Sequence, residues 1–90
     1  MLYMVIERYK TPGAIDIYRR AKEQGRFIPD GLEYVASWVD LEFSRCFQVM
    51  KTDNPTLFDD WISHWDDLVE FEVVPVRTSA DAMQVIAPLL

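Results

Sequence analysis

The chain contains little of what metal, disulfide or phosphate chemistry requires. Its 90 residues include one cysteine, one histidine and three glycines. A lone Cys46 cannot form an internal disulfide, and a lone His64 has no second histidine with which to hold a metal ion. The scattered glycines form no phosphate-binding loop. We therefore expect no metal site and no cofactor, and the single cysteine is typical of a reducing compartment.

Positive charge is also scarce. Nine Lys and Arg residues stand against fifteen Asp and Glu residues, which gives a net charge of −6. Such a chain repels nucleic acid phosphates and anionic lipid headgroups, so we expect neither as a partner. No apolar run approaches the thickness of a bilayer, and the first residues lack the charged start and the cleavage site of a secretory signal. We expect a cytoplasmic protein that does not bind membranes.

Hydrophobic residues, by contrast, are abundant. They make up 50% of the chain and aromatic residues 13%, which is too much core material for a disordered chain. A chain of 90 residues can build one small core but not two. We therefore expect a single domain over residues 1–90.

The order of the apolar runs predicts a strand, a helix, two strands, a helix, a strand and a short closing helix. In the first run both faces are mostly apolar, which is typical of a central strand covered on two sides. Pro75 in the last run favours an edge strand, because proline cannot complete a central hydrogen-bond ladder. The predicted strands cover residues 2–9, 32–39, 45–51 and 71–77.

Helices are predicted from their start signals and their apolar stripes. The first covers residues 12–24 and follows a Thr11 cap. The second follows an Asn54 cap, and the closing helix follows a cap at Thr78 or Ser79. The predicted buried residues are Ala14, Ile17, Tyr18 and Ala21 in the first helix and Leu57, Trp61, Ile62 and Trp65 in the second.

This connectivity is that of a ferredoxin-like βαββαβ sandwich, an α+β fold with a short C-terminal helix. Its first and third strands are central, and its two longer helices cover one face of the sheet. The other face is left bare, although its predicted residues are too apolar for contact with water. We therefore expect a homodimer in which two open sheets pack face to face as a dimeric α/β barrel. The residues predicted for this face are Tyr3, Val5, Tyr34, Trp38, Met50 and either Phe71 or Val74.

Four segments carry a resemblance to a known family: MLYMVIERY, GLEYVASWVD, RCFQVMKTDNP and EFEVVPVRTSADA. They resemble an uncharacterised bacterial family of short proteins, a domain of unknown function, over nearly the whole chain. The resemblance implies a ferredoxin-like fold that assembles as a dimeric α/β barrel. That structural group includes small monooxygenases, muconolactone-isomerase-like proteins and stress-response barrel proteins. The resemblance implies no established reaction and assigns no catalytic residues.

Glu7 is the first candidate for a functional residue. It lies among apolar strand residues, and loss of water around it would raise its pKa, as a general acid or base requires. The alternative is a salt bridge at the strand end with Arg45, Arg77 or the Arg8 of a second copy.

Four further residues are candidates for contacts with a ligand. Trp38 could form the wall of a pocket, or simply pack in a dimer interface. Gln48 could orient a ligand carbonyl, or bond to backbone groups. Arg45 and Tyr3 are predicted near the same open sheet. Cys46 is interpreted as a structural thiol, because reactive cysteines need an electropositive, accessible setting.

Two functions from different classes follow. The first is a small apolar or aromatic molecule bound between the sheets and the helices, with enzymatic activity left open. The alternative is a non-catalytic dimeric interaction module whose interface is filled by side chains. A cavity of roughly 300 Å³ or more favours the first function, and a filled interface favours the second.

Overall fold

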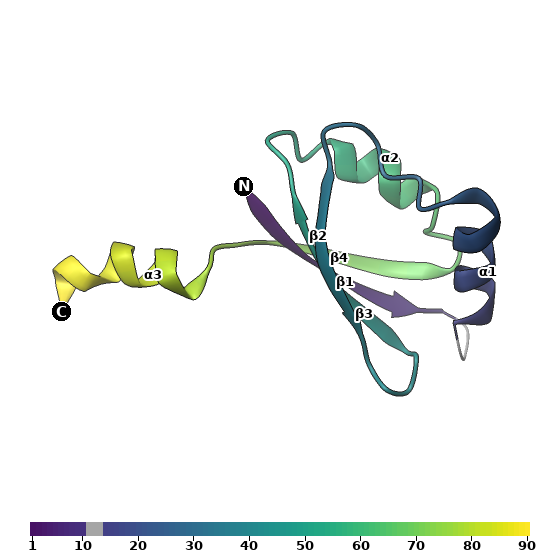
Figure 1. The fold of residues 1–90 in the computed structure, drawn as a ribbon, viewed down its shortest axis with the longest axis horizontal. Helices are drawn as coiled ribbons and strands as arrows, with labels where there is room; N and C mark the ends of the chain where they lie inside the picture. Colours follow the sequence, from purple (N-terminus) through teal and green to yellow (C-terminus); the bar gives the residue numbers. More distant parts are fainter. Residues whose placement is uncertain (11–13) are drawn as a thin grey trace.

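Four strands form one antiparallel sheet in the computed structural model, which describes residues 1–10 and 14–90 (Figure 1). The strand order is β2-β3-β1-β4, so the first and third strands are central and β4, with Pro75, lies at an edge, as predicted. This α+β architecture is compatible with the predicted ferredoxin-like fold. The strands are β1 (Leu2–Tyr9), β2 (Glu33–Val39), β3 (Arg45–Lys51) and β4 (Val69–Val76).

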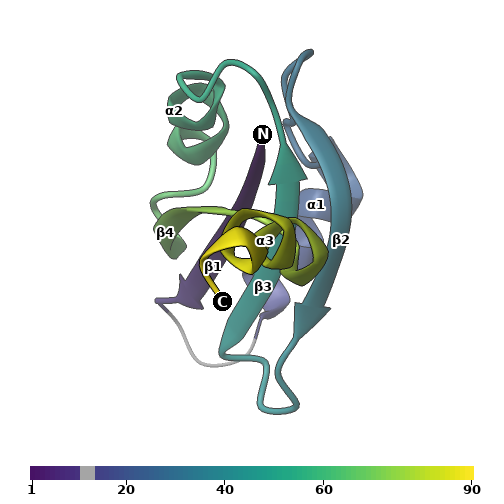
Figure 2. The same ribbon diagram turned by 90° about the vertical axis from the view of Figure 1, so that its left-hand side faces the viewer.

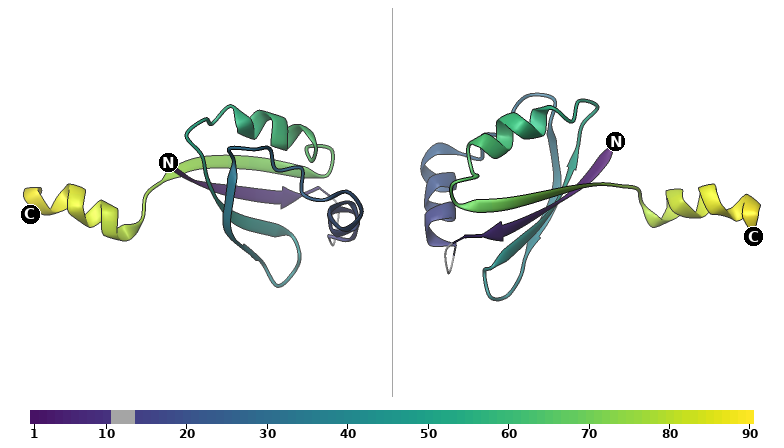
Figure 3. Two further views of the ribbon diagram at one scale, coloured as in Figure 1. Left: turned by 45° about the horizontal axis from the view of Figure 1, so that its top comes forward. Right: turned by 180° about the vertical axis from the view of Figure 1, so that it is seen from behind.

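Two helices, α1 (Ile15–Gln24) and α2 (Leu57–Ser63), lie on one side of the sheet (Figure 3). Between them and the sheet lies the core. A third helix, α3 (Ser79–Ile86), is followed by the short 3-10 helix η1 (Ala87–Leu89). None of the helices among residues 1–10 and 14–90 is both long and apolar enough to cross a membrane. The main core residues are Tyr3, Val5, Leu32, Met50, Phe58, Trp61 and Trp65.

The helix ends agree only partly with the prediction. The predicted Thr11 cap lies outside the described residues. The second helix begins at Leu57, because the Asn54 side chain accepts from the Thr56 backbone N–H at 3.3 Å and holds the preceding residues in a turn. The Thr78 cap is confirmed, since its hydroxyl accepts from the backbone N–H of Asp81 at 3.1 Å.

The assignment of residues to the two sheet faces was largely wrong. Residues paired across neighbouring strands share a face, and Tyr3 pairs with Met50, which is fully buried under the helices. Val5 lies on the same helix-covered face, so these three residues do not belong to the open face. The pattern of β1 could not decide this, because both of its faces are apolar.

A β-bulge in β2 explains a second error. Tyr34 pairs with Met50 but Ala36 pairs with Val49, so the register shifts between them. The bulge therefore places Tyr34 on the helix-covered face and Trp38 on the open face, although simple alternation puts them together.

Of the two alternatives in β4, Val74 is on the open face. Phe71 is on the covered face, because it pairs with Glu7 and its ring lies 5.4 Å from that of Trp61. The apolar residues of the open face are Leu2, Met4, Ile6, Ala36, Trp38, Phe47, Val49, Val74 and Val76.

The C-terminal segment extends away from the rest of the chain (Figure 1). It leaves the end of β4 and carries α3 on the side of the sheet opposite to α1, as Figure 2 shows. The radius of gyration is 15.0 Å, against about 12 Å for a compact chain of this length. We call residues 79–90, which include α3 and η1, the C-terminal arm.

Candidate functional site

A cavity of about 150 Å³ lies between α1 and the helix-covered face of the sheet. Residues of α1 and two tryptophans provide an apolar wall, and strands β1, β2 and β3 provide polar groups opposite to it. The lining residues are Glu7, Tyr9, Ile17, Tyr18, Ala21, Arg26, Ser37, Val39, Cys46, Gln48, Trp61 and Trp65.

An ion pair joins α1 to the turn that follows α2. Arg20 of α1 donates to both carboxylate oxygens of Asp67, at 2.8 and 2.7 Å, and to the His64 carbonyl at 2.9 Å. The Asp67 carboxylate raises the pKa of Arg20, and the Arg20 guanidinium lowers the pKa of Asp67. No residue between Ile15 and Gln24 is fully buried, so this pair is a principal link between α1 and the turn after α2.

The turn after α1 connects the helix to the aromatic wall. The indole N–H groups of Trp61 and Trp65 both donate to the carbonyl of Arg26, at 3.2 and 3.0 Å. Gly25 and Phe27 on either side of Arg26 have positive φ angles of 82° and 61°, a conformation that Phe rarely adopts. Phe27 is held there by stacking on the His64 ring at 4.4 Å. Two buried indoles are thus satisfied by one carbonyl of a tightly turned segment.

Glu7 is the buried acid of the cavity, with only 9% of its surface exposed. Loss of water raises its pKa from 4.5 to about 7, although a hydrogen bond with Cys46 and the charge of Arg26 oppose the rise. At neutral pH the carboxyl group is therefore close to half protonated. Glu7 can donate a proton to a ligand or accept one under the same conditions.

Cys46 and Tyr9, the two titratable neighbours of Glu7 in the cavity, have raised pKa values and keep their protons at neutral pH. Burial, reinforced by the Glu7 charge, raises the pKa of Cys46 to about 12, so its thiol is not a nucleophile at neutral pH. Burial likewise raises the pKa of the Tyr9 hydroxyl above its ordinary value. In this cluster, Glu7 is the group that changes protonation near neutrality.

Gln48 stands beside Glu7 on the neighbouring strand. Its side-chain N–H donates to the sulfur of Met50 at 3.0 Å, which fixes the orientation of the amide. No fully buried side-chain oxygen or nitrogen in the described part of the chain lacks a hydrogen-bond partner. An oxygen of Glu7 or Gln48 that has no such partner therefore keeps some accessible surface, and both residues line the cavity.

The five predicted site residues do not form one group. Glu7 and Gln48 line the cavity together, but on the helix-covered face and not on the open face that the prediction gave them. Tyr3 packs edge to face on the Phe58 ring at 5.1 Å, within the core.

The other two predicted residues lie away from the cavity. Trp38 is on the open face and is 58% exposed. Arg45 closes the hairpin between β2 and β3, where its backbone N–H donates to Asp40 at 3.0 Å. Hydrogen bonds from Ser44 and Arg45 lower the pKa of Asp40 to about 2.

Sequence reasoning missed Arg26 and Tyr9, and placed Trp61 and Trp65 only in the core. Arg26 follows the helix in a segment with no periodic pattern, so no simple signal pointed to it. Its guanidinium lies 4.5 Å above the Tyr34 ring, which keeps the positive charge near the cavity. Tyr9 continues the alternation of Tyr3, Val5 and Glu7, which correctly predicts the same face, but it was not named as a site residue.

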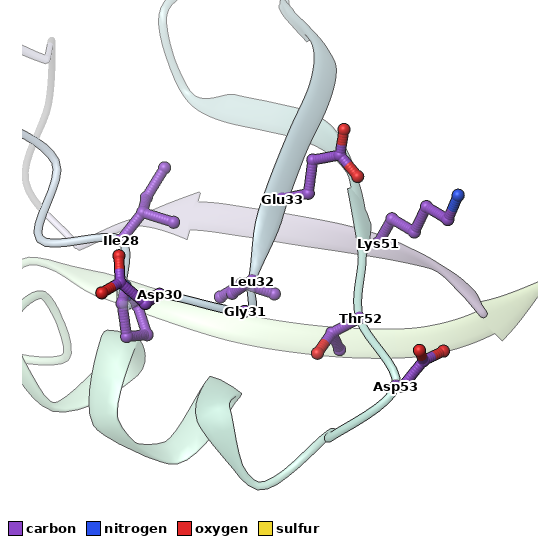
Figure 4. Close-up of a pocket in the computed structure, with 9 residues that line it drawn as sticks. Ile28, Asp30, Gly31, Leu32, Glu33, Lys51, Thr52 and Asp53 are labelled. Carbon is purple, nitrogen blue, oxygen red and sulfur yellow. The ribbon is translucent and has the colours of Figure 1, made fainter.

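A second hollow, of about 440 Å³, lies where the turn before β2 meets the end of β3 (Figure 4). Its charged residues are Asp30, Glu33, Lys51 and Asp53. Figure 4 shows Asp30 on the opposite side of the hollow from Lys51 and Asp53, so these charges do not converge on one point. The cavity below α1, in which polar groups face an aromatic wall, is therefore the better candidate site.

Comparison with known proteins identifies the family of the chain but adds no chemistry. No curated protein and no solved structure matches the chain. One family model matches residues 1–90, which is the whole chain. This match agrees with the resemblance to an uncharacterised domain family that the sequence suggested. The chain belongs to the family described as domain of unknown function DUF3303.

Proposed function

We propose that this protein is a cytoplasmic homodimer that binds a small, single-ring aromatic or apolar molecule in the cavity below α1. The observation that carries the proposal is the arrangement of the cavity, in which Glu7 and Gln48 face Trp61 and Trp65. An apolar wall with a few convergent polar groups is the usual composition of a small-molecule site.

The volume restricts the size of the ligand. About 150 Å³ is half of the roughly 300 Å³ that would favour a drug-sized ligand, so the cavity does not reach that volume and is too small for such a molecule. An apolar cavity of about 150 Å³ holds one benzene ring. The favoured ligand is therefore one ring with one polar substituent, and not an extended or multi-ring compound.

The polar wall indicates which substituent fits. A hydroxyl group can donate to Glu7 when the carboxyl group is ionised, and a carbonyl group can accept from it when it is protonated. Above pH 7 the ionised Glu7 repels a ligand carboxylate placed beside it, so a neutral polar group suits this part of the wall. A phenol, through its hydroxyl group, and an aromatic aldehyde, through its carbonyl group, can each bond to Glu7 without adding a negative charge.

The three tryptophans allow a direct test by NMR with phenol and benzaldehyde as probes. The indole N–H signals of Trp61 and Trp65, which line the cavity, should shift on titration. The indole signal of Trp38, on the open face, should stay in place and serves as the internal control. Shifts confined to Trp38, or no saturable shift with either probe, would contradict the proposed site.

A pair of variants separates cavity binding from nonspecific adsorption. Ala21→Leu adds a larger side chain to a position that lines the cavity and should weaken phenol binding about tenfold or more. Trp38→Phe keeps the cavity intact and should bind phenol as the wild type does. Equal binding by Ala21→Leu and wild type would move the ligand to another surface.

The homodimer is supported by the open face of the sheet. Its residues Met4, Ile6, Phe47 and Val49 are only half-buried in the single chain, and they adjoin one another across the central strands. A contiguous apolar surface of this kind favours association with another chain. The same surface favours the alternative function, a non-catalytic dimeric interaction module, which would be preferred if neither probe enters the cavity.

A further inference from the structure

The C-terminal arm is a helix without a surface to pack on. All residues from 79 to 90 are exposed, and Met83 and Ile86 remain 58% and 50% accessible. Met83 and Ile86 are three positions apart in α3, so they share one side of the helix, and Leu90 follows at the end of the arm. Helices shorter than about 12 residues are marginal in water on their own, and most helices depend on packing of an apolar side. This arm therefore requires a partner surface that its own chain does not supply.

The direction of the arm limits where that surface can be. Figures 1 and 2 show α3 projecting from the end of β4 on the open side of the sheet, with α1 on the other side. A molecule seated on the open face would therefore lie alongside the arm. One chain thus carries two unpartnered apolar surfaces that point toward the same space.

The exposed area corresponds to one side of a protein interface. The chain exposes 6250 Å², whereas a compact protein of 10.6 kDa exposes about 5,500 Å². The excess of roughly 750 Å² is close to the ~800 Å² that each partner buries in a standard interface. A second copy, which presents the same excess, matches this requirement on both sides.

We infer that the C-terminal arm is an exchanged clamp: each arm packs the Met83 and Ile86 side of α3 against a second copy seated on the open face. The inference rests on the homodimer of the proposed function, but not on the ligand. Two-fold symmetry makes the exchange reciprocal, so each chain gives one arm and receives one. Asp81 and Gln84, on the other side of the helix, remain in water.

Charge substitutions on two sides of α3 test the clamp in the full-length chain. Met83→Glu combined with Ile86→Glu should weaken the dimer about a hundredfold or more in sedimentation equilibrium, because two buried apolar side chains become charged. Gln84→Glu adds a charge beside Asp81, on the other side of the helix, and should leave the dimer unchanged. Circular dichroism of both variants checks that the sheet and the helices are retained.

A cross-linking experiment identifies what the arm touches. A photoreactive benzoylphenylalanine replaces Met83 in ¹⁵N-labelled chains, which are mixed with unlabelled chains and allowed to exchange subunits. Cross-links from labelled arms to unlabelled peptides support the clamp. Cross-links within one labelled chain would show an arm that folds back on its own body, and would overturn it.

The remaining outcomes distinguish a failure of the clamp from a failure of the proposed homodimer. Phe47→Glu, on the open face, serves as a reference that should dissociate the dimer. If Phe47→Glu dissociates it but Met83→Glu with Ile86→Glu does not, the homodimer stands and the clamp is overturned. A wild-type protein that stays monomeric at micromolar concentrations, or that grows into open assemblies, also overturns the clamp. The phenol titration is independent of all these results.

Discussion

The two faces of the sheet differ in how they use polar groups. The helix-covered face carries Glu7 and Gln48 in the middle of its central strands, beneath α1. The open face is apolar in the middle of its central strands, and a charged pair joins Arg8, near the end of β1, to Glu72, which stands next to Ile6 on the edge strand. A buried carboxyl group would destabilise an interface between chains, because removing its charge from water is costly unless the charge is paired. The proposed ligand site therefore lies on the covered face, and the proposed dimer interface lies on the open face.

The largest expected contrast comes from two methionines on opposite faces. Met50 is fully buried under the helices, and Met50→Ala should lower the free energy of unfolding by about 2–5 kcal/mol. Met4 is half-buried on the open face, and Met4→Ala should cost about 1 kcal/mol under conditions where the chain is monomeric. Urea unfolding at two protein concentrations measures both. If the open face is an interface, the cost of Met4→Ala rises with concentration and that of Met50→Ala does not.

The second contrast concerns two glutamates and the dependence of stability on pH. The pKa of Glu7 rises from 4.5 in the unfolded chain to about 7 in the fold, so the native state binds a proton more tightly. Its contribution is fully present below pH 4.5 and is lost as pH rises through 7, a loss of about 3 kcal/mol.

Glu7→Gln should therefore remove this loss, and the variant should be more stable than the wild type at pH 8. Glu23→Gln, at an exposed position of α1, is the matched control and should keep the wild-type decline between pH 4.5 and 7. Thermal unfolding across this range measures the effect. A Glu7→Gln variant that declines in parallel with the wild type would show that Glu7 is not the group that titrates.

Much of the fold could be predicted because the residues that begin and end helices and strands act as local signals in the sequence. The strands at residues 2–9 and 45–51 were predicted with the observed bounds, and Pro75 correctly indicated an edge. Thr78 was correctly given as a cap of the last helix. Each of these features depends on residues within a few positions of one another, which is the range over which sequence signals act.

The faces of the sheet could not be predicted from the same signals. Which side of β1 is covered depends on where Phe58 and Trp61 pack, and that is a long-range contact. The bulge before Ala36 places Tyr34 on the face opposite to the predicted one, and no glycine in the strand indicates a bulge there. For the candidate site, Glu7 and Gln48 were visible as polar residues within apolar strands. Arg26 was not visible in this way. It lies in the tight turn between Gly25 and Phe27, and the positive φ angle of Phe27 cannot be inferred from its residue type.

The smallest contrast compares the two ion pairs. Arg20 and Asp67 join through two hydrogen bonds and link α1 to the turn after α2, whereas Arg8 and Glu72 share one bond of 3.1 Å between half-exposed side chains. Exposed single pairs contribute little to stability, while a paired guanidinium and carboxylate also fixes geometry. Arg20→Gln should therefore raise amide hydrogen exchange across α1 several-fold and weaken phenol binding, because the helix that covers the cavity opens more often. Arg8→Gln should leave both unchanged. Equal exchange in the two variants would mean that apolar contacts of Ile17 and Ala21 hold α1 over the cavity, and that the ion pair of Arg20 does not.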